Sequence, residues 1–364
     1  MTSILLFAIG AGLLVYSAEK LIVYLVGAAA GLHVSVFLLA ILFTGIEFDD
    51  VALGVALNVE DLGGVALGTV FGTAISMTGI VLALAAIVCP TRISIPRSYL
   101  VLFAVSPLMM IPFVLAAPLT PADGVVLLLL FGAFLAYVAA NELRSATPVF
   151  RNAEILERIG AGGGADGAPG PAAPGGGVPA AGGPGGGRAG DEPPFTVMMP
   201  FSKTRPLPRW GGLALAVLAL IGLVAGAAIT SEGISGILDG FEIQGTLFGA
   251  TIATLVLSLE DLFLTVEPNR RGAPEIGIGN VIGSVVFGVT AKLGIILITG
   301  GRIDVENNVL AWHLPVLVVM TGISAYFLST GRLRRWHGVL LLALYVTYWV
   351  VSFTVFGAAP IDPD

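Results

Sequence analysis

The chain has 364 residues, of which 56% are hydrophobic and 11% are charged, with a formal net charge of -7 and a mean hydropathy of +0.96. A water-soluble domain needs a largely polar surface, so this composition excludes a soluble globular protein and indicates an integral membrane protein. The excess of acidic residues also argues against nucleic acid as a partner, because phosphate binding requires clustered positive charge.

Hydrophobic stretches of about 20 residues, long enough to cross a bilayer as helices, follow one another along the chain. They lie roughly at 3 to 28, 35 to 57, 64 to 88, 98 to 117, 122 to 141, 211 to 236, 244 to 266, 275 to 299, 308 to 328 and 337 to 357. The alternating segments of a membrane β-barrel do not occur. The sequence therefore predicts an all-α integral membrane protein with ten transmembrane helices, the first of which is retained rather than cleaved as a signal peptide.

A segment rich in Gly, Ala and Pro separates the first five stretches from the last five. Residues 160–190 consist almost wholly of these residue types, without the period of a collagen helix, and they cannot bury enough apolar surface to fold. We therefore divide the chain into a first five-helix repeat at 1–142, a flexible linker at 143–210, a second five-helix repeat at 211–358 and a short tail at 359–364. The linker is expected to be a passive tether.

Positive charge is concentrated in loops that share one side of this topology. The loops at 89–97, 142–210, 267–273 and 329–336 hold nearly all the Lys and Arg, whereas the opposite side holds only Arg302. By the positive-inside rule these loops face the cytoplasm. We expect a multi-pass protein of the cell membrane with both termini outside and the linker in the cytoplasm.

Five helices per half require the second half to enter the membrane from the opposite face, so an inverted repeat is expected. Residues 45–50, Gly-Ile-Glu-Phe-Asp-Asp, match residues 256–261, Val-Leu-Ser-Leu-Glu-Asp. Further along, residues 68–74, Gly-Thr-Val-Phe-Gly-Thr-Ala, match residues 279–285, Gly-Asn-Val-Ile-Gly-Ser-Val, and each carries a pair of small residues that allows close helix approach. Inverted repeats usually place a substrate site near the midplane, between the halves.

At these residues the chain resembles the sodium/calcium exchanger family of the cation/calcium antiporter superfamily. The family's repeats read approximately Gly-Thr-Ser-x-Pro-Glu and then Gly-Asn-x-x-Gly-Ser-Asn/Asp, and residues 274–284 are the closest single stretch. The resemblance spans nearly all of the membrane portion. It implies that the acid ending the first motif of each repeat coordinates the transported cation, a role that falls on Asp50 and Asp261.

The chain departs from the family pattern at several site positions. Acid replaces the family's proline in both repeats, as Asp49 and Glu260. The positions that complete the family's site from helices 3 and 8 fall on Ala74 and Val285, which cannot ligate a metal ion. Lys292 stands where the family has an apolar residue. The family's selectivity for sodium and calcium therefore does not transfer automatically to this chain.

Acidic side chains within the hydrocarbon layer are costly and usually face a cavity, a partner or an ion path. Since Glu47 and Asp50 are three residues apart, we expect them to share a helix face and to converge with Asp261. Hard cations such as Ca²⁺ take six to eight oxygens, and closely spaced carboxylates also let protons compete for them. The predicted metal ligands are Asp50, Asp261 and Glu47, and the wider predicted cation site adds Ser258, Asp49, Glu260, Thr73 and Ser284.

The leading interpretation is a secondary antiporter that exchanges Ca²⁺ or another cation for Na⁺ or H⁺ by alternating access. Motifs of ATP-driven pumps and hydrolases do not occur, so neither an enzyme nor a cofactor is expected, and the partners are inorganic cations and the bilayer. A non-transporting sensor or scaffold of the same fold, with Lys292 as an internal counter-charge, is one alternative, and a cation channel is another. An open polar cavity would favour transport, whereas a dry contact between an aspartate and Lys292 would favour the sensor or scaffold.

Overall fold

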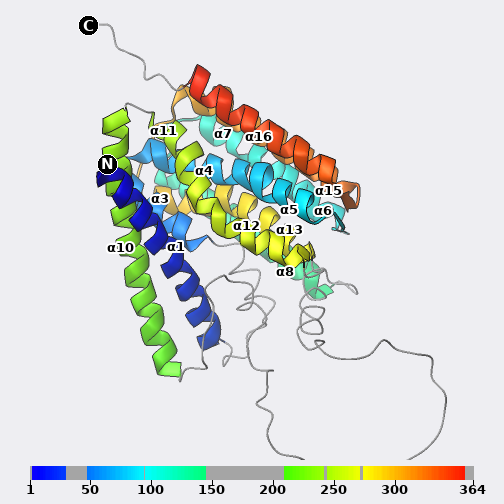
Figure 1. Cartoon of the computed structure of the whole chain (residues 1–364), viewed down its shortest axis with the longest axis horizontal. Helices are drawn as coiled ribbons and strands as arrows, with labels where there is room; N and C mark the ends of the chain where they lie inside the picture. The colour runs from blue at the N-terminus through cyan, green and yellow to red at the C-terminus, as the bar shows by residue number, and fades with distance from the viewer. Residues whose placement is uncertain are drawn as a thin grey trace, which may run out of the picture.

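The protein is described by a computed structural model that places residues 2–29, 47–93, 95–144, 209–241, 244–270 and 274–356. These residues form an almost entirely helical bundle (Figure 1). Eight of its helical segments are long and apolar enough to span a membrane. The two other predicted spans correspond to shorter apolar helical segments, the 12 residues of Phe48–Val59 and the stretch Gly245–Leu259. The structure thus confirms an all-α, multi-pass membrane fold.

Among its described residues, the first half contains seven α-helices, a π-helical turn, a 3-10 turn and a two-residue strand. In chain order these are α1 (Thr2–Ala29), α3 (Phe48–Val59), α4 (Gly63–Ser76), the π-helix η1 (Met77–Val81), α5 (Leu82–Val88), β1 (Thr91–Arg92), α6 (Arg97–Val105), the 3-10 turn η2 (Ser106–Met109), α7 (Met110–Leu115) and α8 (Pro121–Arg144). The segments α4, η1 and α5 follow one another without a break, and we refer to them together as the first central rod.

The second half repeats this layout. Its elements are α10 (Arg209–Phe241), α11 (Gly245–Phe248), the π-helix η4 (Gly249–Ala253), α12 (Thr254–Arg270), α13 (Pro274–Phe287), the π-helix η5 (Gly288–Lys292), α14 (Leu293–Gly300), the π-helix η6 (Val309–His313), α15 (Leu314–Ser329), β2 (Arg332–Leu333) and α16 (Arg335–Val355). Here α13, η5 and α14 run on continuously and form the second central rod.

The two rods keep the register that the sequence motifs predict. The first rod begins at Gly63 and the second at Pro274, while their π-helical turns begin at Met77 and Gly288. Both pairs are 211 positions apart (274 minus 63, and 288 minus 77). The same offset relates Asp50 to Asp261, so the matched acids occupy matched places in the two halves.

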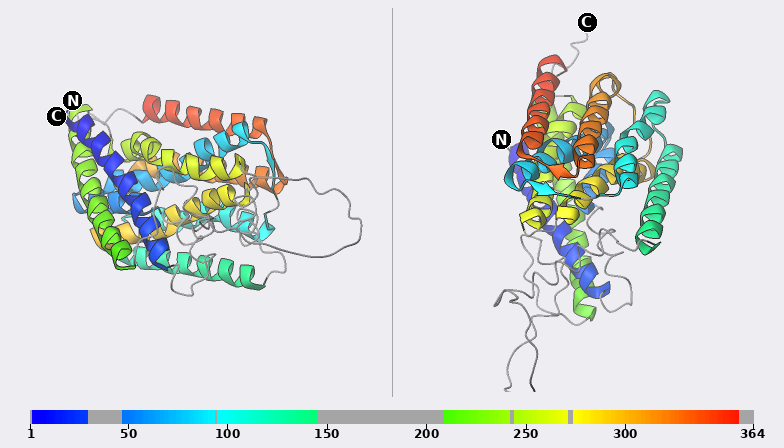
Figure 2. Two further views of the ribbon diagram at one scale, coloured as in Figure 1. Left: turned by 60° about the horizontal axis from the view of Figure 1, so that its bottom comes forward. Right: turned by 90° about the vertical axis from the view of Figure 1, so that its right-hand side faces the viewer.

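Helices of each half pack against helices of the other half. Helix α1 packs along α10, and the last helix of each half packs on the central rod of the other, α8 against α14 and α16 against α5. Likewise α3 contacts α14, and α12 contacts α5. Figure 1 shows α1 and α10 together at one side of the molecule and α16 toward the other, and the left view of Figure 2 shows α1 and α10 side by side from another direction. This exchange of contacts is what an inverted pair of repeats requires.

Burial distinguishes the central helices from the peripheral ones. In each central rod, 83% of the apolar window is buried within the protein, compared with 22% in α8 and 28% in α16. Large apolar side chains such as Leu129, Tyr326 and Val355 are exposed on the peripheral helices. The exposed apolar surface suits contact with lipid, and the two central rods lie where lipid does not reach.

Small residues let the halves approach closely at the centre. A β-carbon added to Gly68 would collide with the backbone carbonyl of Thr246, and one added to Gly72 would collide with Ala250 and the hydroxyl of Thr254. Each collision partner belongs to the opposite half. The predicted role of the small residue pair in the first repeat is confirmed.

One predicted helix differs from the structure at the site itself. The second span was expected to be helical from 35 to 57, but Glu47 is not helical, with φ -80° and ψ 86°, and α3 begins at Phe48. Residues 35–46 and the linker at 145–208 lie outside the described residues. The expectation that Glu47 and Asp50 share one helix face is therefore wrong. Asp49 and Asp50 instead occupy the first turn of α3, where the positive end of the helix dipole favours carboxylates.

Candidate cation site

A buried ion pair joins the two halves at the centre of the protein. The ammonium group of Lys292, at the end of η5, donates to Asp50 Oδ2 in α3. It also donates to Thr73 Oγ1 at 3.0 Å and approaches the carbonyl of Thr69 at 3.4 Å. The Thr73 hydroxyl in turn donates to Asp50 Oδ2 at 2.7 Å. Lys292, Asp50 and these oxygens thus form a closed network, which we call the occupied cluster.

The position of Lys292 follows from helix geometry. Side chains on a helix lean toward its N-terminus, which directs Lys292 back along η5 rather than toward the end of α14. The lysine contacts Asp50 and is completely buried. The matched position in the first half, 211 residues earlier, is Val81, which is also completely buried. The lysine therefore breaks the pseudo-symmetry of the two repeats.

The matched aspartate of the second half has a different environment. Asp261 in α12 accepts a hydrogen bond from Asn280 Nδ2 at 3.4 Å, and the same amide approaches the Thr265 hydroxyl at 3.4 Å. Within the described residues, no lysine or arginine forms a salt bridge with Asp261. Its carboxylate is nevertheless buried, at 8% exposure.

Glu47 is buried beside these groups and lacks hydrogen-bond partners. Asp261, Asp50 and Lys292 all lie close enough to act on its charge, and the Ser284 hydroxyl is close enough to stabilise that charge although its geometry falls outside that of a formed hydrogen bond. Within the described part of the chain, neither carboxylate oxygen of Glu47 has a hydrogen bond, nor does Ser284 Oγ or Asn280 Oδ1. Buried polar atoms without partners are rare and typical of sites that hold water, an ion or a ligand. We call Glu47, Asp261, Asn280 and Ser284 the open cluster.

Acidic character extends from the open cluster toward α1. Asp49 is buried and acts on the charges of both Asp261 and Glu19. Glu19 is 1% exposed, and its carboxylate oxygens have no hydrogen-bond partner among the described residues. The side chain of Glu260, the counterpart of Asp49, lies outside the described residues. We call Glu19, Glu47, Asp49, Asp50 and Asp261 together the acidic centre. Its residues come from α1, from α3 with the residue before it, and from α12.

Ser258, a residue of the wider predicted cation site, links the two halves. Its hydroxyl accepts a 2.7 Å hydrogen bond from Ser76 in the first central rod. Its role as a cation ligand stays a prediction. In the described part of the chain, no three His, Cys, Asp or Glu side chains are grouped tightly enough to hold a metal ion by themselves. A cation bound here would need hydroxyl, amide or carbonyl oxygens together with the carboxylates.

The sequence did not predict that Asn280, Ser76 and the carbonyl of Thr69 belong to the site, or that Glu19 lies near Asp49. A signal existed for Asn280, because it follows Gly279 at the opening of the second helical motif and is the counterpart of Thr69 in the first. Both residues contribute an oxygen or an amide to the cluster of their own half. For Ser76, no pattern in the chain indicated that it would meet Ser258.

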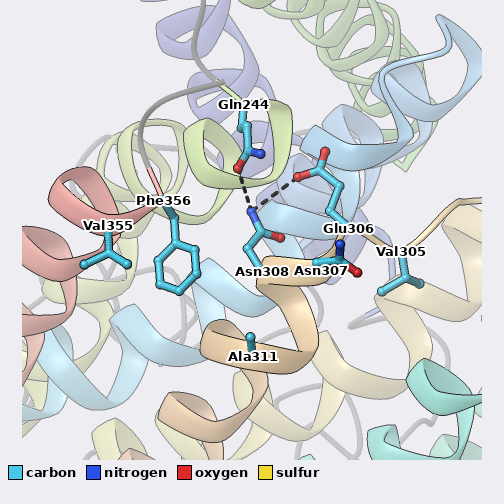
Figure 3. A pocket seen from close by; sticks show the side chains of 8 residues that line it. All are labelled: Gln244, Val305, Glu306, Asn307, Asn308, Ala311, Val355 and Phe356. Carbon is cyan, nitrogen blue, oxygen red and sulfur yellow. Dashed lines mark hydrogen bonds between the residues drawn. The ribbon is translucent and has the colours of Figure 1, made fainter. Parts of the chain in front are cut away.

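A second polar region lies between α11 and η6, apart from the acidic centre (Figure 3). Asn308 Nδ2 donates to Gln244 Oε1 at 3.0 Å and to Glu306 Oε2 at 3.3 Å, which ties the start of α11 to the start of η6. With one carboxylate it suits a hard cation less well than the acidic centre does. The pocket has a volume of about 440 Å³ and is lined by Gln244, Val305, Glu306, Asn307, Asn308, Ala311, Val355 and Phe356.

Comparison with protein families gives one match that covers most of the chain. The family model described as sodium/calcium exchanger protein matches residues 2–140 and 211–354, which are the two membrane halves without the linker. The gap between the matched parts coincides with the segment that we expected to be a tether.

Individual relatives and solved structures agree with that match. The chain is 32% identical over 143 residues to the sodium/calcium exchanger MaX1 of Methanosarcina acetivorans, covering 38% of this chain and 40% of that protein. It is 30% identical over 141 residues to the uncharacterized membrane protein MJ0091 of Methanocaldococcus jannaschii, covering 37% and 43%. These sequence matches thus span about two fifths of each relative. A structure of the sodium-calcium exchanger NCX_Mj, soaked with Na⁺ and Sr²⁺, covers 97% of this chain and 98% of its own with a TM-score of 0.56 and 20% identity, which shows a shared fold.

Proposed function

Because this chain belongs to the sodium/calcium exchanger family, we propose that it is a secondary antiporter that exchanges Ca²⁺ or another cation for Na⁺ or H⁺. The observation that carries the proposal is the open cluster between the two halves. Its buried carboxylates and unpartnered oxygens are the ligand types that hard cations prefer, and buried carboxylates without a counter-charge favour binding of a cation. The exchanger named among the relatives supports the same class of substrate.

The mechanism that fits this fold is alternating access. The open cluster draws Glu47 from the first half and Asp261, Asn280 and Ser284 from the second, so relative movement of the halves would change which side of the membrane it faces. Neutralisation by a cation lowers the cost of keeping the carboxylates buried during that movement. Each crossing therefore requires a cation or its counter-ions on the acidic centre, which couples the two fluxes.

We also propose that the protein lies in the cell membrane with both termini outside and residues 143–210 in the cytoplasm. The support is the concentration of Lys and Arg in the loops of one side. The division into repeats at 1–142 and 211–358 belongs to the same proposal.

A flux assay tests the proposed function. Purified protein in liposomes should take up radioactive Ca²⁺ when a Na⁺ or H⁺ gradient is imposed, and Asp261→Asn should abolish the uptake. Asp304→Asn is the matched control, because it makes the same chemical change on an exposed side chain paired with Arg302. The control should transport like the unaltered protein.

Other outcomes would favour the alternatives. Uptake that does not depend on the imposed gradient would indicate a channel. The contact between Asp50 and Lys292 favours a non-transporting sensor or scaffold, because it satisfies part of the acidic centre internally. Absence of gradient-driven flux for Ca²⁺, Mn²⁺, Na⁺ and K⁺ would overturn the antiporter proposal and support that second candidate.

A further inference from the structure

We propose that the ammonium group of Lys292 is a resident cation that fills one half of the transport site, so that the protein takes up one cationic charge fewer than its acidic centre would otherwise bind. The inference rests on the proposed function for its meaning in transport. Its structural content, a cation site filled by a side chain, can be measured by ion binding alone.

The oxygens around Lys292 are those that a bound cation would use. An ammonium group has three donor protons and no acceptor. In the occupied cluster it meets three oxygens of different kinds: the carboxylate of Asp50, the hydroxyl of Thr73 and the carbonyl of Thr69. The three oxygens match the three protons, and all come from α3 and α4 of the first half. The lysine reaches across from the second half to complete this set.

The matched residues of the second half form a comparable set without a lysine, with a side-chain amide in place of a backbone carbonyl. At the offset of 211 positions, Asp50, Thr69 and Thr73 correspond to Asp261, Asn280 and Ser284. Val81 takes the place of Lys292, and it cannot supply a charge. Asn280 Oδ1 and Ser284 Oγ are buried without hydrogen-bond partners among the described residues. One half thus holds its cation covalently, and the other half has oxygens available for a cation from solution.

If Lys292 is replaced by an uncharged residue, a second cation from solution should be needed, at Asp50. Lys292→Met leaves Asp50 buried without its counter-charge, an arrangement that is strongly destabilising unless a cation neutralises it. The double variant Asp50→Asn/Lys292→Met removes both charges, so it should not need an additional cation. Both variants carry the same methionine and therefore the same change in packing at position 292. A difference between them reports the uncompensated charge of Asp50.

Ion binding provides the first measurement. The thermal unfolding temperature of purified protein is followed as Na⁺ replaces N-methylglucamine at constant ionic strength, and the steepness of the response gives the number of Na⁺ ions taken up on folding. Lys292→Met should take up about one Na⁺ more than the unaltered protein. The double variant should match the unaltered protein.

Transport provides the second measurement. In liposomes, the membrane potential at which net cation flux stops gives the charge moved in each cycle. Lys292→Met should change that charge by about one elementary charge, and whatever flux remains in the double variant should carry the original charge.

The outcomes separate the two proposals. Equal Na⁺ uptake in all three proteins, or a Lys292→Met variant that fails to fold at every Na⁺ concentration, would overturn the resident cation even if the unaltered protein transports normally. Extra Na⁺ uptake by Lys292→Met in a protein without gradient-driven flux would uphold the resident cation and overturn the antiporter.

Discussion

The hydroxyl groups of Ser76 and Ser258 lie 2.7 Å apart and form a hydrogen bond between the first central rod and α12 of the second half. Both side chains are buried, and the contact lies next to the acidic centre, three residues before Asp261. Ser258 corresponds to Glu47 in the repeat register. The two matched positions therefore differ in their contacts: Glu47 has no hydrogen bond among the described residues, and Ser258 bonds to the other half.

This pair allows a test of whether Ser258 ligates a cation or only stabilises the contact between the halves. Ser76→Ala and Ser258→Ala should each destabilise the protein by about 1 kcal/mol, and the double variant should be no worse than either single one, because the same hydrogen bond is lost. Unfolding in detergent with increasing denaturant measures these differences. A cation affinity that falls in Ser258→Ala but not in Ser76→Ala would show instead that Ser258 ligates the ion.

The pseudo-symmetry of the rods predicts the effect of a second lysine. Val81 lies in η1, which contacts α12 and α13, just as η5 contacts α3 and α4. Val81→Lys should place an ammonium group near Asp261 and Asn280 and compete with the transported cation. We expect at least a tenfold loss of gradient-driven flux with a normal elution profile in detergent, whereas Val81→Met should retain flux. Equal flux in the lysine and methionine variants would contradict the placement of the transported cation on the open cluster.

Close packing of the rods predicts that a glycine-to-alanine substitution lowers the stability of the protein at one helical position and not at another. Gly68→Ala should destabilise the protein by about 1 to 3 kcal/mol, because its β-carbon would collide with the Thr246 carbonyl. Gly132→Ala is the control, since no atom lies within 4 Å of its added β-carbon and alanine is the better helix former. Thermal unfolding should rank Gly132→Ala at or above the unaltered protein and Gly68→Ala well below it. The reverse order would be inconsistent with the described approach of the halves.

The orientation in the membrane can be tested with the single cysteine of the chain. Cys89 follows α5, is partly exposed, and lies in a loop that the charge distribution assigns to the cytoplasm. A membrane-impermeant maleimide should label Cys89 in inside-out vesicles and leave it unlabelled in intact cells. The variant Cys89→Ser reports background labelling in both preparations. Labelling in intact cells would reverse the proposed topology.

Much of the fold could be predicted from the sequence because lipid imposes a simple rule. Backbone polar groups in hydrocarbon must bond within their own helix, so about 20 apolar residues in a row suffice to identify a span such as α8 or α16. The repeat register was also accessible, because Asp50 and Asp261 each follow another acid and each precede a motif with two glycines at the same spacing. The direction of Lys292 followed from the lean of side chains on a helix.

The break at Glu47 could not be predicted in the same way. Residues 35 to 57 are apolar enough to be predicted as one helix, because they contain no proline and a single glycine such as Gly45 is tolerated within a membrane helix. Glu47 precedes the first turn of α3 and lies among the charges of Asp50, Asp261 and Lys292, two of which belong to the other half. Ser258 illustrates the same limit, because its hydroxyl meets a residue 182 positions away.

The sequence by itself determined the membrane class, the inverted halves, their offset and the identity of the intramembrane charges, because all of these depend on local hydrophobicity and on recurring order along the chain. Only the tertiary structure decided which charges meet. The pairing of Lys292 with Asp50, and the absence of such a partner from Asp261 among the described residues, depend on how two central rods from opposite halves are packed. In a medium of low dielectric constant, that pairing decides which carboxylates are neutralised within the protein and which are available to a cation.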